Sequence, residues 1–360
     1  MRAGVRPVMR CGGRRGERGY VLLFVTVSLA VIALVAARFA LRIEALREQA
    51  ASLQGYAEAR VAAVSARSMA LYWLSTRPIG LASAGFLDEA PLVLDGRPYG
   101  LSGGVQVQVQ DARGLLSANA PDHAAWTNAL RSAGASPDDA AAMIDVLEDY
   151  TDIDNLRRLN GAEAADYLAL GLQPPRNDWL LSVDEVERML VWRRLPDVRQ
   201  RMKPWLSVRR DPLFNPNTAP LELLQAIWPQ VGADQWTLFQ TLRRQGPFAD
   251  AAAATAATGI PFTAAENLLF HASNAVRITV RAPGLPQALE YNVLLMPAGN
   301  YAPWWIHEIR FSQSLVPVAG QPENGSERID AFATAVSTAT PFPTPSRAVA
   351  VPGKGTQPAP

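Results

Sequence analysis

Four side chains with oxygen atoms that could ligate a divalent cation follow one another closely in the middle of the chain. They are Asp152, Asp154, Asn160 and Glu163. Counted from the first of them, they occupy positions 1, 3, 9 and 12, several of the ligand positions of a calcium-binding loop. The sixth position holds Arg157 in place of the usual glycine, and Arg158 follows it, so two positive charges would oppose a cation. A turn that ends a helix and is held by local ion pairs is therefore the alternative interpretation.

Other catalytic or metal-binding chemistry has little support in the sequence. His123, His271 and His307 are scattered, and the single cysteine, Cys11, excludes an intrachain disulfide. The chain contains no G-x-S-x-G, S-x-x-K or Walker A pattern, which argues against a serine nucleophile or a nucleotide-phosphate loop. We therefore expect a protein that is not an enzyme.

A possible nucleic-acid motif lies at residues 214–227, which read FNPNTAPLELLQAI and resemble one half of a helix-hairpin-helix module. Such modules hold DNA phosphates with backbone N–H groups at the start of a helix. Four basic residues precede the segment: Arg201, Lys203, Arg209 and Arg210. The glycine-rich hairpin is absent, however, and residues 20–360 carry a net charge of −4. We therefore predict a packing role for this segment and expect no nucleic-acid partner.

The first 19 residues differ from the rest of the chain, since they hold six arginines and one acid. Their net charge is therefore +5, whereas the net charge of the whole chain is +1. Residues 20–37 follow without a charge. A helix of that length would span roughly 27 Å, which is close to the apolar thickness of a bilayer. The segment is compatible with a signal peptide cut after Ala37, with a permanent anchor, or with a type IV prepilin-like segment cut after Gly19.

The apolar segment continues into an amphipathic pattern, with no proline between residues 20 and 77 and Gly55 as its one glycine. This predicts a single helix over 20–74. A cleavable signal peptide does not usually continue into a long amphipathic helix. The pattern favours the prepilin-like alternative, with a leader at 1–19 and processing between Gly19 and Tyr20. The basic flank predicts a cytoplasmic N-terminus and a C-terminal part on the other side of the membrane.

The remainder alternates between strand and helix patterns. Residues 105–110 read VQVQVQ, a half-buried strand, and strand patterns return at 275–282, 288–295 and 304–311. In the last of these, one of the adjacent residues Trp304 and Trp305 is expected in the core and the other at an interface. Between them the period is helical, with helix starts expected at four positions: Ser136, Ser182, Thr218 and Thr263.

These patterns predict an α+β fold in which strands from both sides of a helical block share one antiparallel sheet. The expected segments are a first part of the α+β domain at 75–110, an inserted helical domain at 111–274, a second part at 275–313, and a disordered tail rich in Pro, Ser and Thr at 314–360.

Three segments give this arrangement a family resemblance. Residues 110–120 (QDARGLLSANA) are similar to a strand-end pattern D-x-x-G-x-x-x-x-N, residues 145–167 to D-W-x-D-x-D…N-G-A-E…Y with Tyr150 in place of Trp, and residues 214–227 to N-x-N-T-A-x-x-x-L. Together with Gly19 before an apolar helix, they resemble the type II secretion minor pseudopilin K (general secretion pathway protein K) family. The resemblance implies a pilin-like fold with an inserted helical domain of the helix-hairpin-helix or SAM-like type.

One position separates this family from most pilins and pseudopilins, which carry Glu at the fifth mature residue. Counted from Tyr20, that residue is Phe24, and the K component also lacks the Glu. In a growing filament the carboxylate would pair with the first amino group of a neighbouring subunit, because a lone buried charge is costly. A subunit without it need not dock below an earlier one, which suits a position at the filament tip.

The resemblance implies a minor pseudopilin that caps the pseudopilus, helps to initiate its assembly and supports export of folded proteins across the outer membrane. The implied partners are the I, J and H minor pseudopilins and the prepilin peptidase, and calcium is the implied cofactor. The implied location is the bacterial inner membrane, with a periplasmic C-terminal domain. A minor pilin of a type IV pilus and a periplasmic DNA-uptake protein are the alternatives.

Overall fold

The computed structural model describes residues 17–86, 88, 90–296, 299 and 302–312. Its chain forms two units, Met1–Ala59 and Arg60–Pro360. The helix α1 (Glu17–Thr76) contributes its first part to one unit and its last part to the other. Most of the expected leader and the expected tail at 314–360 lie outside the described residues, so these two expectations stay predictions.

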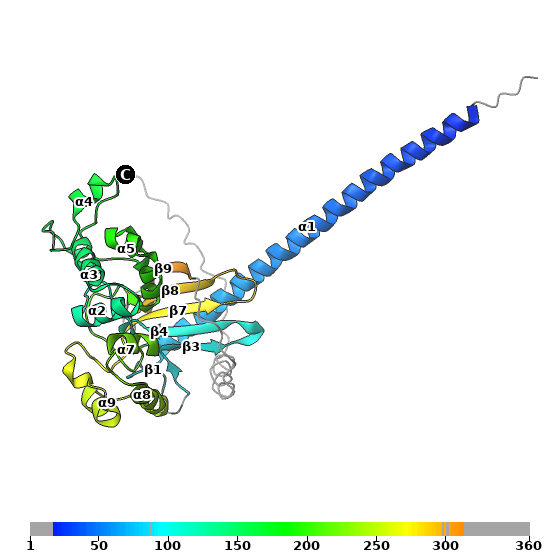
Figure 1. Ribbon diagram of the computed structural model, residues 1–360. Helices are drawn as coiled ribbons and strands as arrows, with labels where there is room; N and C mark the ends of the chain where they lie inside the picture. Colours follow the sequence, from blue (N-terminus) through cyan, green and yellow to red (C-terminus); the bar gives the residue numbers. More distant parts are fainter. Residues whose placement is uncertain (1–16, 87, 89, 297–298, 300–301, 313–360) are drawn as a thin grey trace, which may run out of the picture. The chain divides into compact units, whose positions relative to one another are not determined.

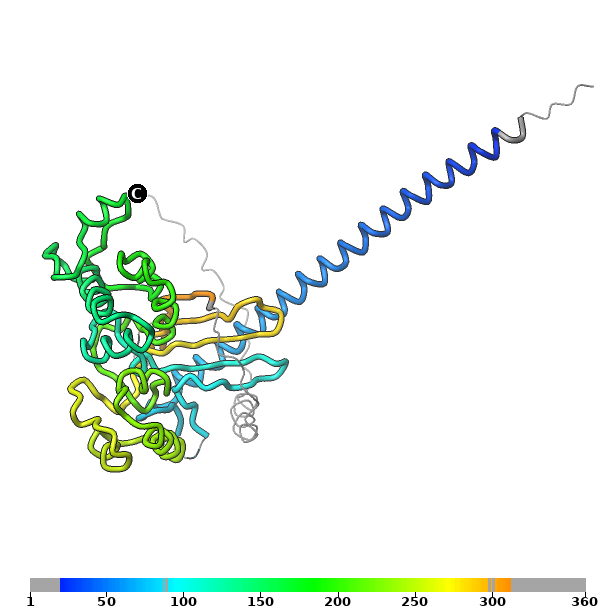
Figure 2. The backbone as a smooth tube through the Cα atoms, viewed as in Figure 1, coloured from blue at the N-terminus to red at the C-terminus, as the bar shows by residue number. Residues whose placement is uncertain are grey.

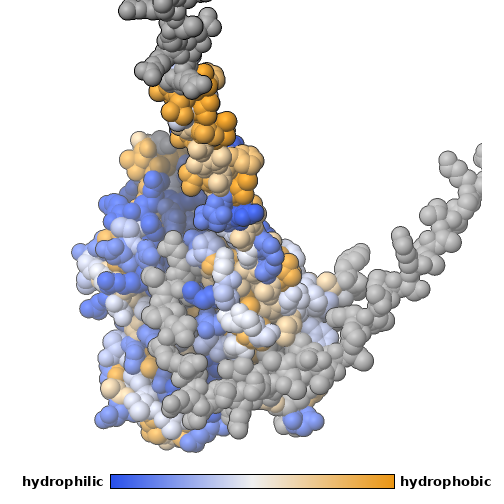
Figure 3. All heavy atoms as spheres, turned by 90° about the vertical axis from the view of Figure 1, so that its right-hand side faces the viewer, coloured by the Kyte–Doolittle hydropathy of each residue, from blue (hydrophilic) through white to orange (hydrophobic). Residues whose placement is uncertain are grey.

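The described part of the first unit is residues 17–59 of α1, and this long N-terminal helix confirms the expectation from the sequence. Nearly all its described side chains are exposed, including the large apolar ones at Tyr20, Phe24 and Phe39. Figure 3 shows hydrophobic residues gathered along this helix. Among the described residues it is the one helix that is long and apolar enough to cross a membrane. Its placement in a membrane stays a prediction.

The second unit is built on a five-stranded sheet with the order β3-β4-β7-β8-β9, in which all neighbours are antiparallel. Its strands are β3 (Asp95–Gly100), β4 (Gln106–Asp111), β7 (Ala275–Arg281), β8 (Ala288–Leu295) and β9 (Trp304–Ser312). In Figure 2 the cyan strands before the helical segment lie beside the yellow and orange strands after it. The expected α+β architecture, with a helical insertion between strands of one sheet, is thereby confirmed.

The last part of α1, from Arg60 onward, covers one face of this sheet. Small residues on one side of the helix are buried there: Ala63, Ala66 and Ala70. The Arg67 guanidinium lies over the ring of Tyr291 on β8, 5.1 Å from its centre. The Trp73 indole N–H donates to the Ala84 carbonyl in the short pair β1 (Ser83–Ala84) and β2 (Leu92–Val93). Small side chains let a helix approach the sheet closely.

The helical insertion leaves the sheet after β4 and returns before β7 (Figure 1). Its α-helices are α2 (His123–Ser132), α3 (Pro137–Thr151), α4 (Ala164–Ala169), α5 (Leu190–Arg194), α6 (Pro196–Met202), α7 (Leu221–Ile227), α8 (Ala233–Gln245) and α9 (Ala251–Thr258). A parallel pair of two-residue strands, β5 (Leu116–Ser117) and β6 (Leu206–Ser207), ties its beginning to its middle. The core is aromatic, with Trp126 and Trp192 packed edge to face at 6.1 Å. Such rings bury large apolar areas in short helices.

Two of the four expected helix starts differ from the structure. Thr263 does not start a helix but lies inside the single 3-10 turn Phe262–Ala264. The chain after this turn pairs with Phe214, whose N–H donates to the Asn267 carbonyl. Thr218 does not cap α7, whose first flanking residue is Pro220. The Thr218 hydroxyl instead donates to the buried carboxylate of Asp111. In both cases a tertiary contact overrides the local pattern. The starts at Ser136 and Ser182 are confirmed, the first for α3 and the second for a 3-10 helix over Val183–Arg188.

The junction between sheet and insertion is held by Asp111, the last residue of β4, whose side chain is fully buried. One carboxylate oxygen accepts from the Arg113 N–H and from the Ser273 N–H and hydroxyl. The other accepts from the Thr218 hydroxyl at 2.8 Å and the Asn215 amide at 3.3 Å. A carboxylate that accepts several hydrogen bonds is stable without water. Asp111 therefore joins three segments: the start of the insertion at Arg113, the segment around Asn215 and Thr218, and the end of the insertion at Ser273.

The same junction explains the glycine of the strand-end pattern. A Cβ at Gly114 would lie 2.7 Å from the carbonyl oxygen of Thr218, which is backbone and has little room to move. Any larger residue would therefore separate the 110–120 segment from the 214–227 segment.

Replacing Asp111 by Ala is expected to lower the free energy of unfolding by about 3–5 kcal/mol, because buried donors lose their acceptor. The measurement is the midpoint of urea unfolding of the full chain in detergent, followed by tryptophan fluorescence. The exposed Glu266→Ala variant is the control, with an expected change of about 0.5 kcal/mol or less. A change as small in the Asp111 variant as in the control would contradict this account of the junction.

Candidate metal centre

The helix α3 brings several acids to one place at its C-terminal end. The Ser136 hydroxyl accepts from the Asp139 N–H and so fixes where the helix begins. From there the 3.6-residue period turns the apolar side chains of α3 into the core and leaves Asp145 and Glu148 toward the following loop. Asp149 is the exception, since it is an acid with a side chain that is completely buried. A buried carboxylate at this point needs a partner from the loop.

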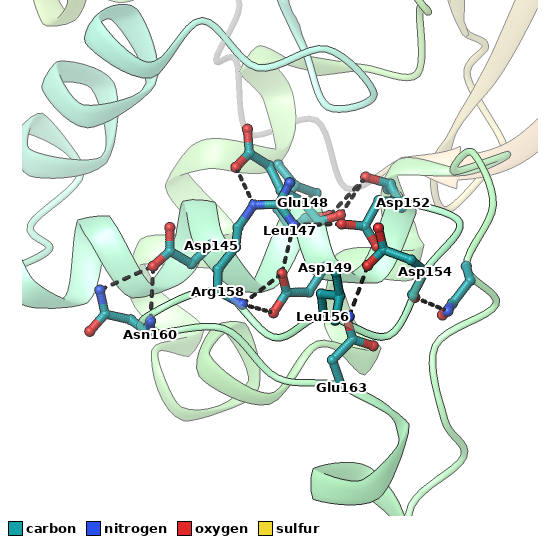
Figure 4. Close-up of polar contacts among 12 residues, drawn as sticks. Asp145, Leu147, Glu148, Asp149, Asp152, Asp154, Leu156, Arg158, Asn160 and Glu163 are labelled. Atoms are coloured by element: carbon teal, nitrogen blue, oxygen red, sulfur yellow. Dashed lines mark hydrogen bonds and ion pairs between the residues drawn. The ribbon is translucent and has the colours of Figure 1, made fainter.

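That partner is Arg158, which folds back from the loop onto the end of α3 (Figure 4). Its guanidinium lies 2.7 Å from Asp149, 2.9 Å from Glu148 and 2.5 Å from Asp152. Burial acts to lower the pKa of Arg158, but the hydrogen bonds to Asp152 and Asp149 outweigh it and raise the pKa above its usual value. The expected turn with local ion pairs is therefore present, and one arginine neutralises part of a group of carboxylates.

A glycine makes this arrangement possible. A Cβ built on Gly161 would lie 1.8 Å from Oδ2 of Asp149, well inside van der Waals contact. Next to it, the Asn160 N–H and side-chain amide both donate to Asp145, at 3.0 Å each. The Asn-Gly pair thus closes the loop against α3, with the asparagine bound to one acid and the glycine making room for another.

Three further carboxylates remain beside the ion pairs and converge on one another. Asp152, Asp154 and Glu163 each offer an oxygen atom, and these three atoms lie within 4.8 Å of one another. Two oxygens bound to one Ca²⁺ at 2.3–2.6 Å would be separated by roughly 5 Å or less, so the spacing suits a shared cation. The group contains neither histidine nor cysteine, and hard oxygen ligands of this kind favour Ca²⁺, Mg²⁺ or Mn²⁺.

Glu163 makes this more than an exposed acidic cluster. Glu163 is 5% exposed, and neither of its carboxylate oxygens has a hydrogen-bond partner among the described residues. Burial, together with the nearby charges of Asp149 and Asp152, raises its pKa to about 7. The Oδ1 atom of Asp152 is likewise buried and without a partner in the described part of the chain. Buried unpaired oxygens are costly, and a bound cation would satisfy them.

The structure brings together three of the four residues expected from the sequence. The side-chain amide of Asn160 is held by Asp145, away from the three carboxylates. Arg157 pairs with Asp166 at 3.2 Å, and Arg158 binds Oδ2 of Asp152, so neither arginine pairs with Oδ1 of Asp152 or with Glu163. The residues that the sequence did not point to are Asp145, Asp149 and Gly161. The Asn-Gly pair and the acids at helical spacing before it were the available signals.

The other candidate residues have different surroundings. Gly19 lies in the first turn of α1, and Tyr20 and Phe24 are exposed on the same helix. His123 contacts Glu148 at 2.8 Å, and the ring of His307 lies 5.9 Å from that of Trp305. Processing at Gly19 stays a prediction.

Residues 214–227, for which the sequence predicts a packing role, contain strongly buried polar side chains. Asn215, Asn217 and Thr218 are at most 1% exposed, and their polar atoms bond within the protein. Lys203, one of the basic residues near this segment, pairs with Asp184 and Glu187. This arrangement gives no support to a phosphate-binding hairpin.

The comparisons with known proteins agree with these motifs. Residues 105–211 match the family model described as type II secretion system (T2SS), protein K. This stretch contains the strand end at Asp111 and the whole of the loop with its acids. Residues 105–211 belong to the type II secretion protein K family. The resemblance found from the motifs is confirmed for this segment.

The solved structure of the GspK-GspI-GspJ complex from enterotoxigenic Escherichia coli type 2 secretion system contains a similar chain. The likeness has a TM-score of 0.48 and 17% sequence identity, and it covers 74% of this chain and 100% of that chain. The comparison with curated proteins finds no match.

Replacing Gly161 by Ala is expected to destabilise the protein K segment by about 2–4 kcal/mol, because the added methyl group would displace the Asp149 carboxylate and break its bonds to Arg158. The matched control is Gly246→Ala, since a Cβ at Gly246 meets no atom within 4 Å. Thermal unfolding of both variants measures the difference. Equal melting temperatures for the two would contradict the role given to Gly161.

Replacing Glu163 by Gln is expected to raise the melting temperature above pH 7 in the presence of EDTA, because an unpaired buried charge is removed. The same variant should lose the stabilisation by Ca²⁺, which for the wild type is about 2.7 kcal/mol at 100 times the dissociation constant. Thermal unfolding with EDTA and with Ca²⁺ measures both effects. The exposed Glu266→Gln variant should respond to Ca²⁺ as the wild type does. A wild type that Ca²⁺ leaves unchanged would rule out the metal centre.

Proposed function

We propose that the protein is a minor pseudopilin of a type II secretion system that caps the pseudopilus tip and helps to start its assembly. The observation that carries the proposal is the match of residues 105–211 to protein K of that system. The structure of the second unit is consistent with it, since this segment begins with β4 of the sheet and continues into the helical insertion, and the end of α1 covers one face of that sheet. A type IV pilus minor pilin shares the helix but is not what the family model describes.

The helix α1 supplies the means of assembly in this proposal. Its apolar first part would lie in the inner membrane before assembly and would pack against the helices of other subunits afterwards. Phe24 at the fifth position after the cut offers apolar contact but no carboxylate, so the subunit requires no neighbour above it. A large inserted domain adds to this, because its bulk suits the end of a filament better than its interior.

The partners in this proposal are the other minor pseudopilins, of which the I and J components share one complex with the K component in the similar solved structure. The prepilin peptidase would cut between Gly19 and Tyr20. Calcium is proposed as a structural ion at Asp152, Asp154 and Glu163, where it would neutralise oxygens that the protein itself leaves unpaired. The protein has no catalytic role in this scheme, and its mature part lies in the periplasm behind a single membrane helix.

Processing is the sharpest test of the proposal. Co-expression with a prepilin peptidase is expected to yield a chain that begins at Tyr20, observed as the intact mass of the purified protein. The Gly19→Lys variant should keep its leader, because a large charged side chain would not enter a site that accepts glycine. The Gly55→Lys variant is the control and should be processed. A wild-type chain that retains Met1, or one cut after Ala37, would contradict the prepilin interpretation.

A further inference from the structure

The sheet has an apolar face that is only partly covered. Two rows of directly paired residues cross it from strand to strand. The first row is Tyr99, Val107, Val280, Leu289 and Phe311, and the second is Val109, Ile278, Tyr291 and Ile309. Every member is at most 9% exposed until the rows reach β9, where Ile309 is 60% and Phe311 66% exposed. The cover supplied by α1 therefore ends at β8.

A β-bulge keeps the apolar residues of β9 on this face. Val293 pairs with Ile306 while its neighbour Asn292 pairs with Glu308, so His307 is an extra residue on β9. Simple alternation would put Ile306 and Ile309 on opposite faces, and the bulge places both on the face that α1 covers. The β9 stripe is defined as Trp304, Ile306, Ile309 and Phe311. It contains no charge, and its first two members are half-buried.

The opposite face of β9 is partly occupied by the helical insertion. Arg310 pairs with Glu290 on β8, and Glu308 accepts from the Ser182 hydroxyl of the helical insertion. Arg277 on β7 donates to the Pro204 and Leu206 carbonyls of the same insertion. The insertion thus covers one face of the sheet with polar contacts, and the β9 stripe is the uncovered border of the other.

We propose that the β9 stripe, beside the end of α1, binds an amphipathic α-helix of another minor pseudopilin. The inference rests on the proposed function, since that function supplies partners with such helices. An added strand at the edge of β9 would pair with its backbone but would leave Ile309 and Phe311 uncovered on the face. A helix lying on the face next to α1, at the usual separation of 8–10 Å, would cover them.

The charge at the border of the stripe indicates one further property of the occupant. Arg67 lies over Tyr291, which pairs directly with Ile309. Its Nε atom is buried and has no hydrogen-bond partner among the described residues. Arg67 as a whole is only half-buried, so its positive charge lies beside the stripe. A helix with an apolar face and an acidic side chain at the position nearest the Arg67 guanidinium would suit both the stripe and this charge.

The test compares two faces of one strand. The double variant Ile309→Ser/Phe311→Ser removes the exposed part of the stripe. The control is Trp305→Ser, because Trp305 is 57% exposed and pairs with Leu294 on the opposite face. Binding of the full chain in detergent to the purified I and J components is measured by biolayer interferometry. The double variant is expected to weaken binding roughly 100-fold, and the control to leave it within about threefold.

Photo-crosslinking identifies the occupant. A benzoylphenylalanine residue at position 309 or 311 should crosslink to a helical segment of a partner pseudopilin, and one at position 305 should not. Crosslinks to a strand of the partner, to a second copy of this chain or to residues 313–360 of the same chain would each overturn the inference. So would equal losses of binding in the double variant and the control.

The two proposals fail in different ways. If the wild-type chain does not bind the I and J components at all, the proposed function fails and the inference fails with it. If the wild type binds and the double variant binds equally well, the inference alone is overturned, and the partner surface lies elsewhere.

Discussion

The Asp111 carboxylate is the interaction on which the arrangement of the second unit depends. It lies where the chain leaves the sheet, and it binds Ser273, immediately before the chain re-enters the sheet at β7. The cost of burying this charge is offset only if all its donors are in place. The sheet and the insertion therefore have to form together at this point. A helical domain of some 160 residues is thus anchored at both ends by one side chain.

The sequence predicted the general architecture because its signals are local. Alternation in VQVQVQ indicates a strand whichever strand it pairs with, and Ser136 before an acidic turn indicates a helix start. The pairing of Asp111 with Ser273 joins residues 162 positions apart, and no local pattern contains that information. The helix starts expected at Thr218 and Thr263 fail for the same reason, because long-range contacts of Thr218 with Asp111 and of residues 267–269 with Phe214 decide the local structure. Tertiary contacts can override any propensity of this size.

In the loop after α3, the sequence likewise predicts some features and not others. Asp152, Asp154 and Glu163 could be selected from their residue types and spacing, and the structure places their oxygen atoms together. The direction of Asn160 could not be predicted, because it depends on the orientation of Asp145 on a helix that packs into the core. The repulsive effect expected of Arg158 also depended on geometry. Its guanidinium binds Glu148, Asp149 and Asp152, so it reduces the negative charge at the end of α3, while both oxygens of Glu163 stay without a hydrogen-bond partner among the described residues.

The two faces of the sheet separate charged side chains from apolar ones. Charged side chains on β8 and β9 all lie on the face toward the insertion, where each finds a partner: Glu290 with Arg310 and Arg277, and Glu308 with Asn292. The face toward α1 has no charged member in its two cross-strand rows. A regular β9 would mix these classes, because the WWIHEIRF sequence alternates correctly only on either side of His307. The bulge restores the separation at the cost of one unpaired residue. The apolar side chains that the bulge aligns on β9 are left exposed at Ile309 and Phe311, which is the pattern expected of a surface that binds a partner.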